Sequence, residues 1–184
     1  MFPIIIAVVV LVVLGGIWIN AYNGEVTRNN AIEKQRSDVH ATLGSRYDKV
    51  LAFIDAIEGA NATVTGYLNI IKDARIAFAE AIDNGELMNA DAESDTIDST
   101  FVTLLAYMEN NPDSYNTVSL YSGFMSEFSA STNAVLNAIE TFNESVESYN
   151  NHIQKFPNNM FLGEKEPYTS YSIENYNTTL PTFK

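Results

Sequence analysis

Carboxylates are the side chains of this sequence that come closest to forming a chemical site. Four acidic residues crowd one short polar stretch: Asp91, Glu93, Asp95 and Asp98. A calcium loop that begins at Asp91 needs Gly at its sixth position and Glu at its twelfth, where this chain has Thr96 and Val102. We therefore interpret the cluster as a solvated loop whose charge favours the start of a following helix, and we predict no metal site.

Other reactive residue types are scarce or wrongly spaced. His40 and His152 are the only histidines, and neither belongs to an HExxH or ExxH arrangement, so we interpret both as surface or rim residues. The absence of cysteine excludes disulfides, zinc–thiolate sites and thiol catalysis. The sequence contains no GxSxG, Walker-type or GxGxxG motif. We predict no catalytic residue, no cofactor and no enzymatic activity.

Composition and charge narrow the kinds of protein that this chain can be. The chain is 46% hydrophobic and 11% aromatic, which is enough for a packed core. Its formal net charge is −13, and no basic stripe offsets this charge, so binding to nucleic acid is not expected.

The first element is an uncharged run, residues 2–19, dominated by Ile, Val and Leu. Its length suits a hydrocarbon layer of about 30 Å, so we predict a transmembrane anchor with the lipid bilayer as its partner. A cleaved signal peptide and a buried core helix are the alternatives. No Lys or Arg precedes the run, which argues against a signal peptide, and Trp18 and Tyr22 follow where an interfacial aromatic belt would lie.

The charges that flank this run bear on its orientation. Arg28, Lys34 and Arg36 follow the run, whereas only the α-amine precedes it. The positive-inside rule then favours a single-pass protein with its N-terminus outside and its C-terminal domain in the cytoplasm.

The last long element predicted is a helix from Val118 to Phe156. All but one of its seam positions are apolar or aromatic, at alternating spacings of three and four: Val118, Tyr121, Met125, Phe128, Thr132, Val135, Ile139, Phe142, Val146, Tyr149, Ile153 and Phe156. Such spacing predicts an α-helix roughly 60 Å long that packs lengthwise on other helices. The aromatic and β-branched seam is typical of the inner face of a bundle, and we expect the soluble domain to be monomeric.

The intervening chain supplies the partner helices. Apolar positions at the same spacing run from Ile32 to Phe78, with a break favoured at Gly44-Ser45, or alternatively at Gly59 to Asn61. An unbroken helix is the remaining alternative. Asn84-Gly85 is a stop signal. A shorter helix follows, capped by Ser94 or Asp95, with its seam at Ile97, Phe101, Leu104 and Met108.

These elements predict an all-α fold in three parts. A transmembrane anchor, residues 1–20, precedes an antiparallel up-and-down four-helix bundle, residues 21–157. The tail, residues 158–184, lacks periodicity but is rich in aromatic residues, so we expect it to lie extended on the bundle.

Pairs of an aromatic residue followed by Asn recur in this sequence. Phe142-Asn143 and Tyr149-Asn150 precede Phe156-Pro157 in the pattern FNxxVxxYNxxIxxFP, and Tyr22-Asn23 follows the apolar run. This pattern resembles the C-terminal signature of the LemA family, which also carries an N-terminal membrane segment followed by a YN pair. Arg46-Tyr47-Asp48, Gly59 and Ala74-Arg75 fall at the family's spacing, whereas Leu51, Thr132 and Ile139 depart from its usual Pro, Glu and Arg.

The resemblance implies a membrane-anchored antiparallel helical bundle, and it implies no activity, because the family has no established biochemical function. The matched residues are candidates for a structural or an interaction role: Tyr22, Asn23, Arg46, Asp48, Arg75, Asn143, Tyr149, Asn150, Phe156 and Pro157. Asn143 and Asn150 share a helix face because they lie two turns apart. If they are structural, both should be partly buried and bonded to a neighbouring segment, and Tyr22-Asn23 should lie near the end of the last helix.

The function predicted is a membrane-anchored helical scaffold or interaction protein with a protein partner of unknown identity. The alternative is a membrane-anchored sensory or ligand-binding domain. A polar interior pocket would favour the alternative, and a filled core with exposed apolar side chains would favour the scaffold.

Overall fold

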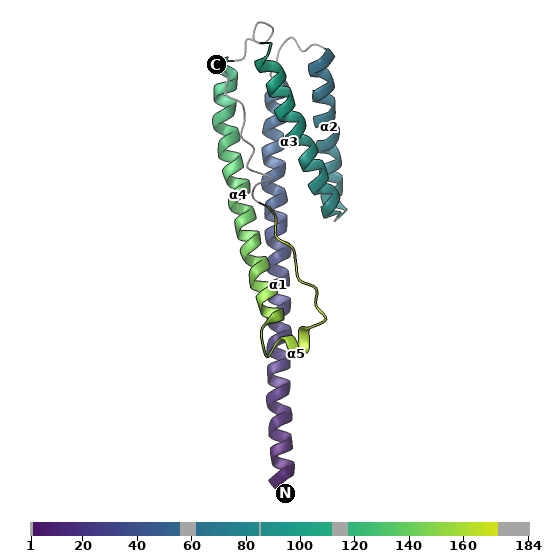
Figure 1. Ribbon diagram of the computed structural model, residues 1–184, viewed down its shortest axis with the longest axis vertical. Helices are drawn as coiled ribbons and strands as arrows, with labels where there is room; N and C mark the ends of the chain where they lie inside the picture. Colours follow the sequence, from purple (N-terminus) through teal and green to yellow (C-terminus); the bar gives the residue numbers. More distant parts are fainter. Residues whose placement is uncertain (1, 56–61, 85, 112–117, 173–184) are drawn as a thin grey trace. The chain divides into compact units, whose positions relative to one another are not determined.

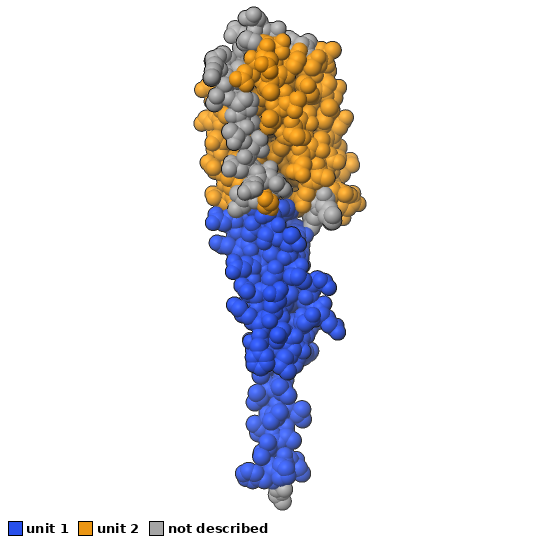
Figure 2. All heavy atoms as spheres, viewed as in Figure 1, with its two compact units in different colours: residues 1–38, 139–171 blue, residues 39–138, 172–184 orange. Residues whose placement is uncertain are grey.

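The computed structural model describes residues 2–55, 62–84, 86–111 and 118–172. Its helices are α1 (Phe2–Asp55), α2 (Ala62–Asp83), α3 (Leu87–Glu109), α4 (Val118–Gln154) and α5 (Asn159–Leu162) (Figure 1). No strand occurs within the described ranges, and the all-α fold class is confirmed. The chain divides into two compact units (Figure 2): unit 1 holds residues 1–38 and 139–171, and unit 2 holds residues 39–138 and 172–184.

Four helices meet in unit 2. The C-terminal part of α1 and the N-terminal part of α4 join α2 and α3 there. Lys72 of α2 pairs with Asp55 of α1 and Arg75 pairs with Asp48, so these two helices run antiparallel. The direction of these two helices agrees with an up-and-down order.

Aromatic rings fill one end of the core of unit 2. Phe53 of α1 stacks on Phe124 of α4 at 4.3 Å between ring centroids, and it meets Phe101 of α3 edge-on at 6.2 Å. Phe128 lies 5.6 Å from Phe101. All four rings are buried, and such offset and edge-to-face pairs add stabilisation beyond the area they bury.

Unit 1 is built from two antiparallel helix segments and the tail. Tyr149 of α4 contacts Glu25 of α1, and His152, further along α4, contacts Ala21, nearer the start of α1. The prediction that Tyr22-Asn23 lies near the end of the last helix is therefore confirmed. The tail then turns back through α5 and runs along α4.

The predicted break at Gly44-Ser45 is wrong, because α1 continues through it. Gly44 is buried, and its neighbours Leu43 and Tyr47 are fully buried. A glycine inside a helix costs about 0.5–1 kcal/mol relative to alanine, which is less than the burial of one large side chain contributes. The other candidate break, Gly59 to Asn61, lies outside the described residues.

The start of α3 also differs from the prediction. The helix begins at Leu87 rather than after a cap at Ser94 or Asp95, so the acidic stretch is helical. Ala90 and Ser94 are both fully buried and continue the seam of Ile97 toward the N-terminus of the helix. Small buried side chains carry little hydrophobic signal, which is why the sequence pattern missed them.

The long helix α4 begins at Val118 as predicted and ends at Gln154. Its seam is buried at Val135, Ile139, Phe142 and Val146. The predicted last seam position is wrong, because Phe156 lies beyond the helix and is 78% exposed. The side chains of Val118 and Tyr121 lie outside the described set.

The N-terminal part of α1 contains the one described helix segment that is long and apolar enough to cross a membrane, and none of that segment is buried. A membrane span is therefore compatible with its length and composition.

Candidate functional site

Two asparagines of α4 hold the backbone of the tail in unit 1. The amide of Asn143 donates to the carbonyl of Tyr171 at 3.0 Å, and its oxygen accepts the backbone N–H of Tyr171 at 2.9 Å. Asn150 makes the same two bonds with Tyr168, both at 2.9 Å. Both asparagines are half-buried. The prediction that they bond a neighbouring segment is therefore confirmed.

The spacing of the two asparagines fits an extended partner. Seven residues of helix rise about 10.5 Å between Asn143 and Asn150. Three residues of extended chain span about 10 Å between Tyr168 and Tyr171. The side-chain amide carries a donor and an acceptor like those of a peptide group, so each asparagine satisfies both polar groups of one tail residue.

The aromatic residue before each asparagine contacts the same tail residue. Phe142 lies 5.0 Å from the ring of Tyr171, and Tyr149 lies 5.0 Å from the ring of Tyr168, measured between centroids. Each aromatic–Asn pair therefore binds one tyrosine twice, through its backbone and through its ring. We call these four residues of α4, together with Tyr168 and Tyr171, the tail clasp.

Side chains of α1 complete the clasp. The guanidinium of Arg36 lies 5.4 Å from the centre of the Phe142 ring and 5.8 Å from that of Tyr168, within the range of cation–π attraction. The hydroxyl of Tyr168 donates to Asn29 at 2.7 Å. This role of Arg36 and Asn29 could not be predicted from the sequence, because their partner Tyr168 lies in a segment without periodicity.

A buried carboxylate lies beside the clasp. Glu25 is 5% exposed and accepts a hydrogen bond from the Tyr149 hydroxyl at 3.3 Å. The ammonium group of Lys165 lies 3.2 Å from the same carboxylate. Burial, reinforced by the charge of Glu25, raises the pKa of Tyr149 to about 12, so its phenol remains a hydrogen-bond donor. The hydrogen bond to Glu25 raises the pKa of Lys165.

His152 joins α4 to α1 at the same end of unit 1. Its Nε2 lies 2.9 Å from the carbonyl oxygen of Ala21, and its Nδ1 lies 3.1 Å from the amide nitrogen of Asn158. That amide also donates to the carbonyl of His152, which fixes its orientation and makes Nδ1 the acceptor. With Nδ1 as the acceptor, Nε2 donates to the Ala21 carbonyl. A Cβ at position 24 would lie 2.6 Å from Cε1 of His152, so any larger residue at Gly24 would require the His152 ring to move.

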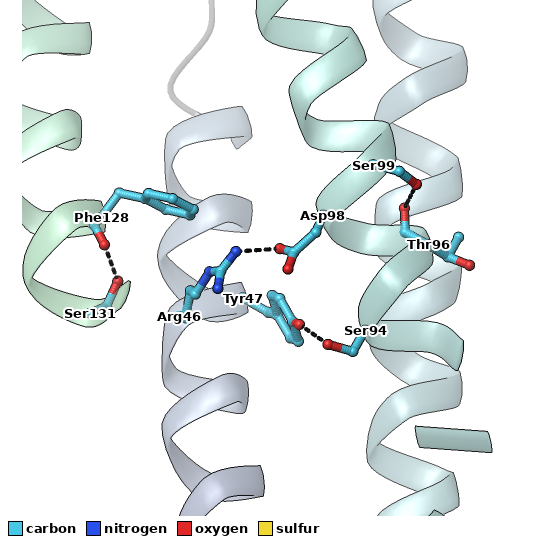
Figure 3. Close-up of polar contacts among 8 residues, drawn as sticks. All are labelled: Arg46, Tyr47, Ser94, Thr96, Asp98, Ser99, Phe128 and Ser131. Carbon is cyan, nitrogen blue, oxygen red and sulfur yellow. Dashed lines mark hydrogen bonds and ion pairs between the residues drawn. The ribbon is translucent and has the colours of Figure 1, made fainter. Parts of the chain in front are cut away.

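Unit 2 holds a second polar site, on α1 and α3 (Figure 3). The Arg46 guanidinium is completely buried and lies 2.6 Å from the carboxylate of Asp98, which is 12% exposed. The same guanidinium lies 4.8 Å from the centre of the Phe128 ring. The neighbouring Tyr47 hydroxyl shares a hydrogen bond with Ser94. We call the pair of Arg46 and Asp98 the buried ion pair.

Burial dominates the electrostatics of this pair. Desolvation raises the pKa of Asp98 to about 6, although the attraction of Arg46 lowers it. Asp98 was assigned to an acidic surface cluster from the sequence, and this interpretation is wrong for Asp98. Among the described residues, no three His, Cys, Asp or Glu side chains form a group that could hold a metal ion.

The other predicted residues lie apart from these two sites. Arg75 pairs with Asp48 at 3.0 Å on the surface of unit 2, where the carboxylate is 65% exposed. Tyr22 is 44% exposed, and Asn23 is exposed. Pro157 is half-buried after a cis peptide bond.

Comparison with known proteins agrees with the sequence signature. The model of the LemA family matches residues 35–184, a range that contains the tail clasp and the buried ion pair but excludes Tyr22 and Asn23. Neither the search of curated proteins nor the search of solved structures found a match. Because the family model covers most of the chain, the chain belongs to the LemA family.

Proposed function

We propose that this LemA-family chain is a membrane-anchored helical scaffold, which holds a protein partner at the membrane through its helical body. The observation that carries this proposal is the uncovered apolar run at the start of α1. Apart from the half-buried Ile17, its large apolar side chains range from 42% exposed at Leu14 to 81% exposed at Phe2. Exposing so much contiguous apolar surface to water is unfavourable, and a bilayer would remove it from water.

The chemistry of both polar sites supports a scaffold more than an enzyme. The tail clasp uses its amides to bind a backbone of the same chain, and the buried ion pair joins two helices. These groups are therefore engaged in holding the protein together. Exposed apolar side chains on α2, namely Ile70 at 47% and Ile76 at 59%, offer contacts for a partner instead.

The alternative, a ligand-binding domain, requires a polar pocket inside the bundle. A hollow of about 390 Å³ lies between the end of α4 and α5, lined by residues such as Gln154 and Glu166. It opens to solvent at the surface of unit 1 rather than lying between helices. The filled aromatic core of unit 2 likewise favours the scaffold.

Alkaline carbonate extraction of cell membranes tests the anchor. The full-length protein should remain in the membrane pellet. Leu11→Arg should increase the released fraction, because an arginine near the centre of a span costs about 2.5–3.5 kcal/mol or more. Recovery of a soluble, N-terminally trimmed protein as the main species would identify the run as a signal peptide and overturn the proposal.

The absence of cysteine makes the orientation easy to test. A single cysteine introduced at the exposed Glu140 can be labelled in intact cells with a membrane-impermeant maleimide. The three cations after the run favour a cytoplasmic domain, so labelling should occur only after the cells are opened. Labelling of intact cells would reverse the proposed orientation.

Cross-linking in intact membranes tests the scaffold itself. A photoreactive amino acid at Ile76 should give one discrete cross-linked product, and the same group at the buried Ile71 should not. A small-molecule sensor would instead give no such product and a melting temperature that rises with its ligand.

A further inference from the structure

The turn between α4 and α5 presents apolar side chains to the surroundings. Phe156 is 78% exposed and Met160 is 65% exposed. Both values fall within the range found in the apolar run of α1, where the proposed bilayer removes the side chains from water. In a water-soluble protein such an aromatic ring would be expected to pack on the nearby helices.

Contacts within unit 1 place this turn beside the end of the apolar run. Before the turn, α4 reaches Ala21 through His152. After it, Lys165 lies 3.2 Å from Glu25 and 5.7 Å from the centre of the Tyr22 ring. The tail then moves along α1 away from the apolar run, since the Tyr168 hydroxyl bonds Asn29. Within unit 1, the chain between residues 153 and 164 therefore lies beside the end of the apolar run (Figure 1).

Cations accompany the apolar side chains at this level. Arg28 and Lys155 line a hollow of about 310 Å³ together with His152 and Asn158. The chain as a whole carries a net charge of −13, so two cations around one hollow contrast with the general surface. Apolar side chains beside Lys and Arg are typical of a surface that lies in the headgroup region of a membrane.

We propose that the α4–α5 turn docks on the bilayer, with Phe156 and Met160 entering the apolar boundary and Arg28 and Lys155 facing the lipid phosphates. This proposal rests on the proposed anchor, because the anchor brings the turn to the membrane surface. The turn gives the body of unit 1 a second attachment point. Two attachment points would fix the rotation of α1 about its own axis, which a single helix leaves free.

Tryptophan fluorescence separates the docking from the anchor. The chain has one tryptophan, Trp18, so quenching of the unaltered full-length protein by brominated lipids reports on the anchor alone. A second protein carries Trp18→Phe and Phe156→Trp, and a third carries Trp18→Phe and Met160→Trp. All are reconstituted at full length in vesicles of phosphatidylcholine and phosphatidylglycerol with bromine at shallow or deep acyl positions.

The proposal expects a blue-shifted emission from tryptophan at positions 156 and 160, with a larger loss of intensity for shallow bromine than for deep bromine. A matched control carries Trp18→Phe and Glu140→Trp, at an exposed position about 21 Å along α4 from its end at Gln154. This control should not be quenched. Its emission should remain that of a solvated indole.

The outcomes are distinct. Quenched Trp18 with unquenched tryptophan at both 156 and 160 would overturn the docking and leave the anchor intact. Unquenched Trp18 would overturn the anchor and, with it, the docking. A red-shifted, unquenched emission at position 156 would show that the turn faces water instead of lipid, and a blue-shifted, unquenched emission would show that it faces protein.

Discussion

The two polar sites each join two segments of the chain, but they do so with different chemistry. The buried ion pair of unit 2 joins α1 to α3 through opposite charges, and its arginine is completely buried. The tail clasp of unit 1 joins α4 to an extended segment through neutral amides, and its asparagines are half-buried. A buried charge is costly to desolvate, and it destabilises the protein strongly when its partner is removed. A neutral amide that pairs with a peptide group carries neither cost to the same degree.

The stability of the two units should therefore depend on different interactions. Unit 2 should depend on the protonation of one carboxylate and on the integrity of one pair. Unit 1 should depend on pairs of neutral hydrogen bonds, each of which restrains one residue of the tail. Variants of the two sites should therefore differ in how much stability they lose and in how that loss depends on pH and salt.

Arg46→Ala should destabilise unit 2 most, by about 3–5 kcal/mol, because it leaves the carboxylate of Asp98 buried without its cation. Chemical denaturation followed by circular dichroism measures the loss. The double variant Arg46→Met with Asp98→Leu removes both charges and should recover most of the stability. A double variant as unstable as Arg46→Ala would show that the unpaired charge does not cause the loss of stability.

The stability of unit 2 should also depend on pH through Asp98. Its folded pKa of about 6 lies above the ordinary value of 3.8, so the folded protein holds the proton more tightly. This contribution is fully present below pH 3.8 and is lost as the pH rises through about 6. The free energy of unfolding, measured relative to Asp98→Asn, should fall across this window by at most about 3 kcal/mol. A flat difference would contradict the raised pKa.

Asn150→Ala should destabilise unit 1 by about 1–3 kcal/mol, because it leaves the N–H and carbonyl of Tyr168 without their partner. The loss should not vary across the window in which Asp98 titrates. The neighbouring Asn151 bonds only an exposed carboxylate at 3.4 Å, so Asn151→Ala is the matched control. Unchanged stability of Asn150→Ala would favour a partner-binding role for this asparagine.

Arg75→Ala should have the smallest effect, about 0–1 kcal/mol, although it also breaks an arginine–aspartate pair. Its partner Asp48 is 65% exposed, so water replaces the lost interaction. Added salt should reduce even this difference. A loss as large as that of Arg46→Ala would show that burial does not decide the strength of these pairs.

The helices were predictable because their packing faces repeat along the sequence. Val135, Ile139 and Phe142 carry the spacing of one helix face, and all three are buried. The same periodicity placed Asn143 and Asn150 on one face beside the seam, which was enough to expect bonds to a neighbour. The start of α3 was missed because Ser94 is a polar residue whose burial depends on its bond to Tyr47.

The partners in both sites could not be predicted from spacing alone. An extended tail has no period of its own, so the sequence does not show that Tyr168 and Tyr171 are the residues that Asn150 and Asn143 bind. The buried ion pair joins residues 52 positions apart, and nothing in the sequence distinguishes the carboxylate of Asp98 from that of the exposed Asp95. The burial of Glu25 could not be predicted either, because a single acidic residue on a polar helix is usually solvated.

Amide hydrogen exchange of the full-length protein in lipid nanodiscs tests the tail clasp most directly. The backbone N–H groups of Tyr168 and Tyr171 donate to Asn150 and Asn143, so both should exchange slowly, although neither belongs to a helix. Asn150→Ala should accelerate exchange at Tyr168 more than at Tyr171. Exchange of both amides in the unaltered protein at the rate of an unstructured peptide would contradict the clasp.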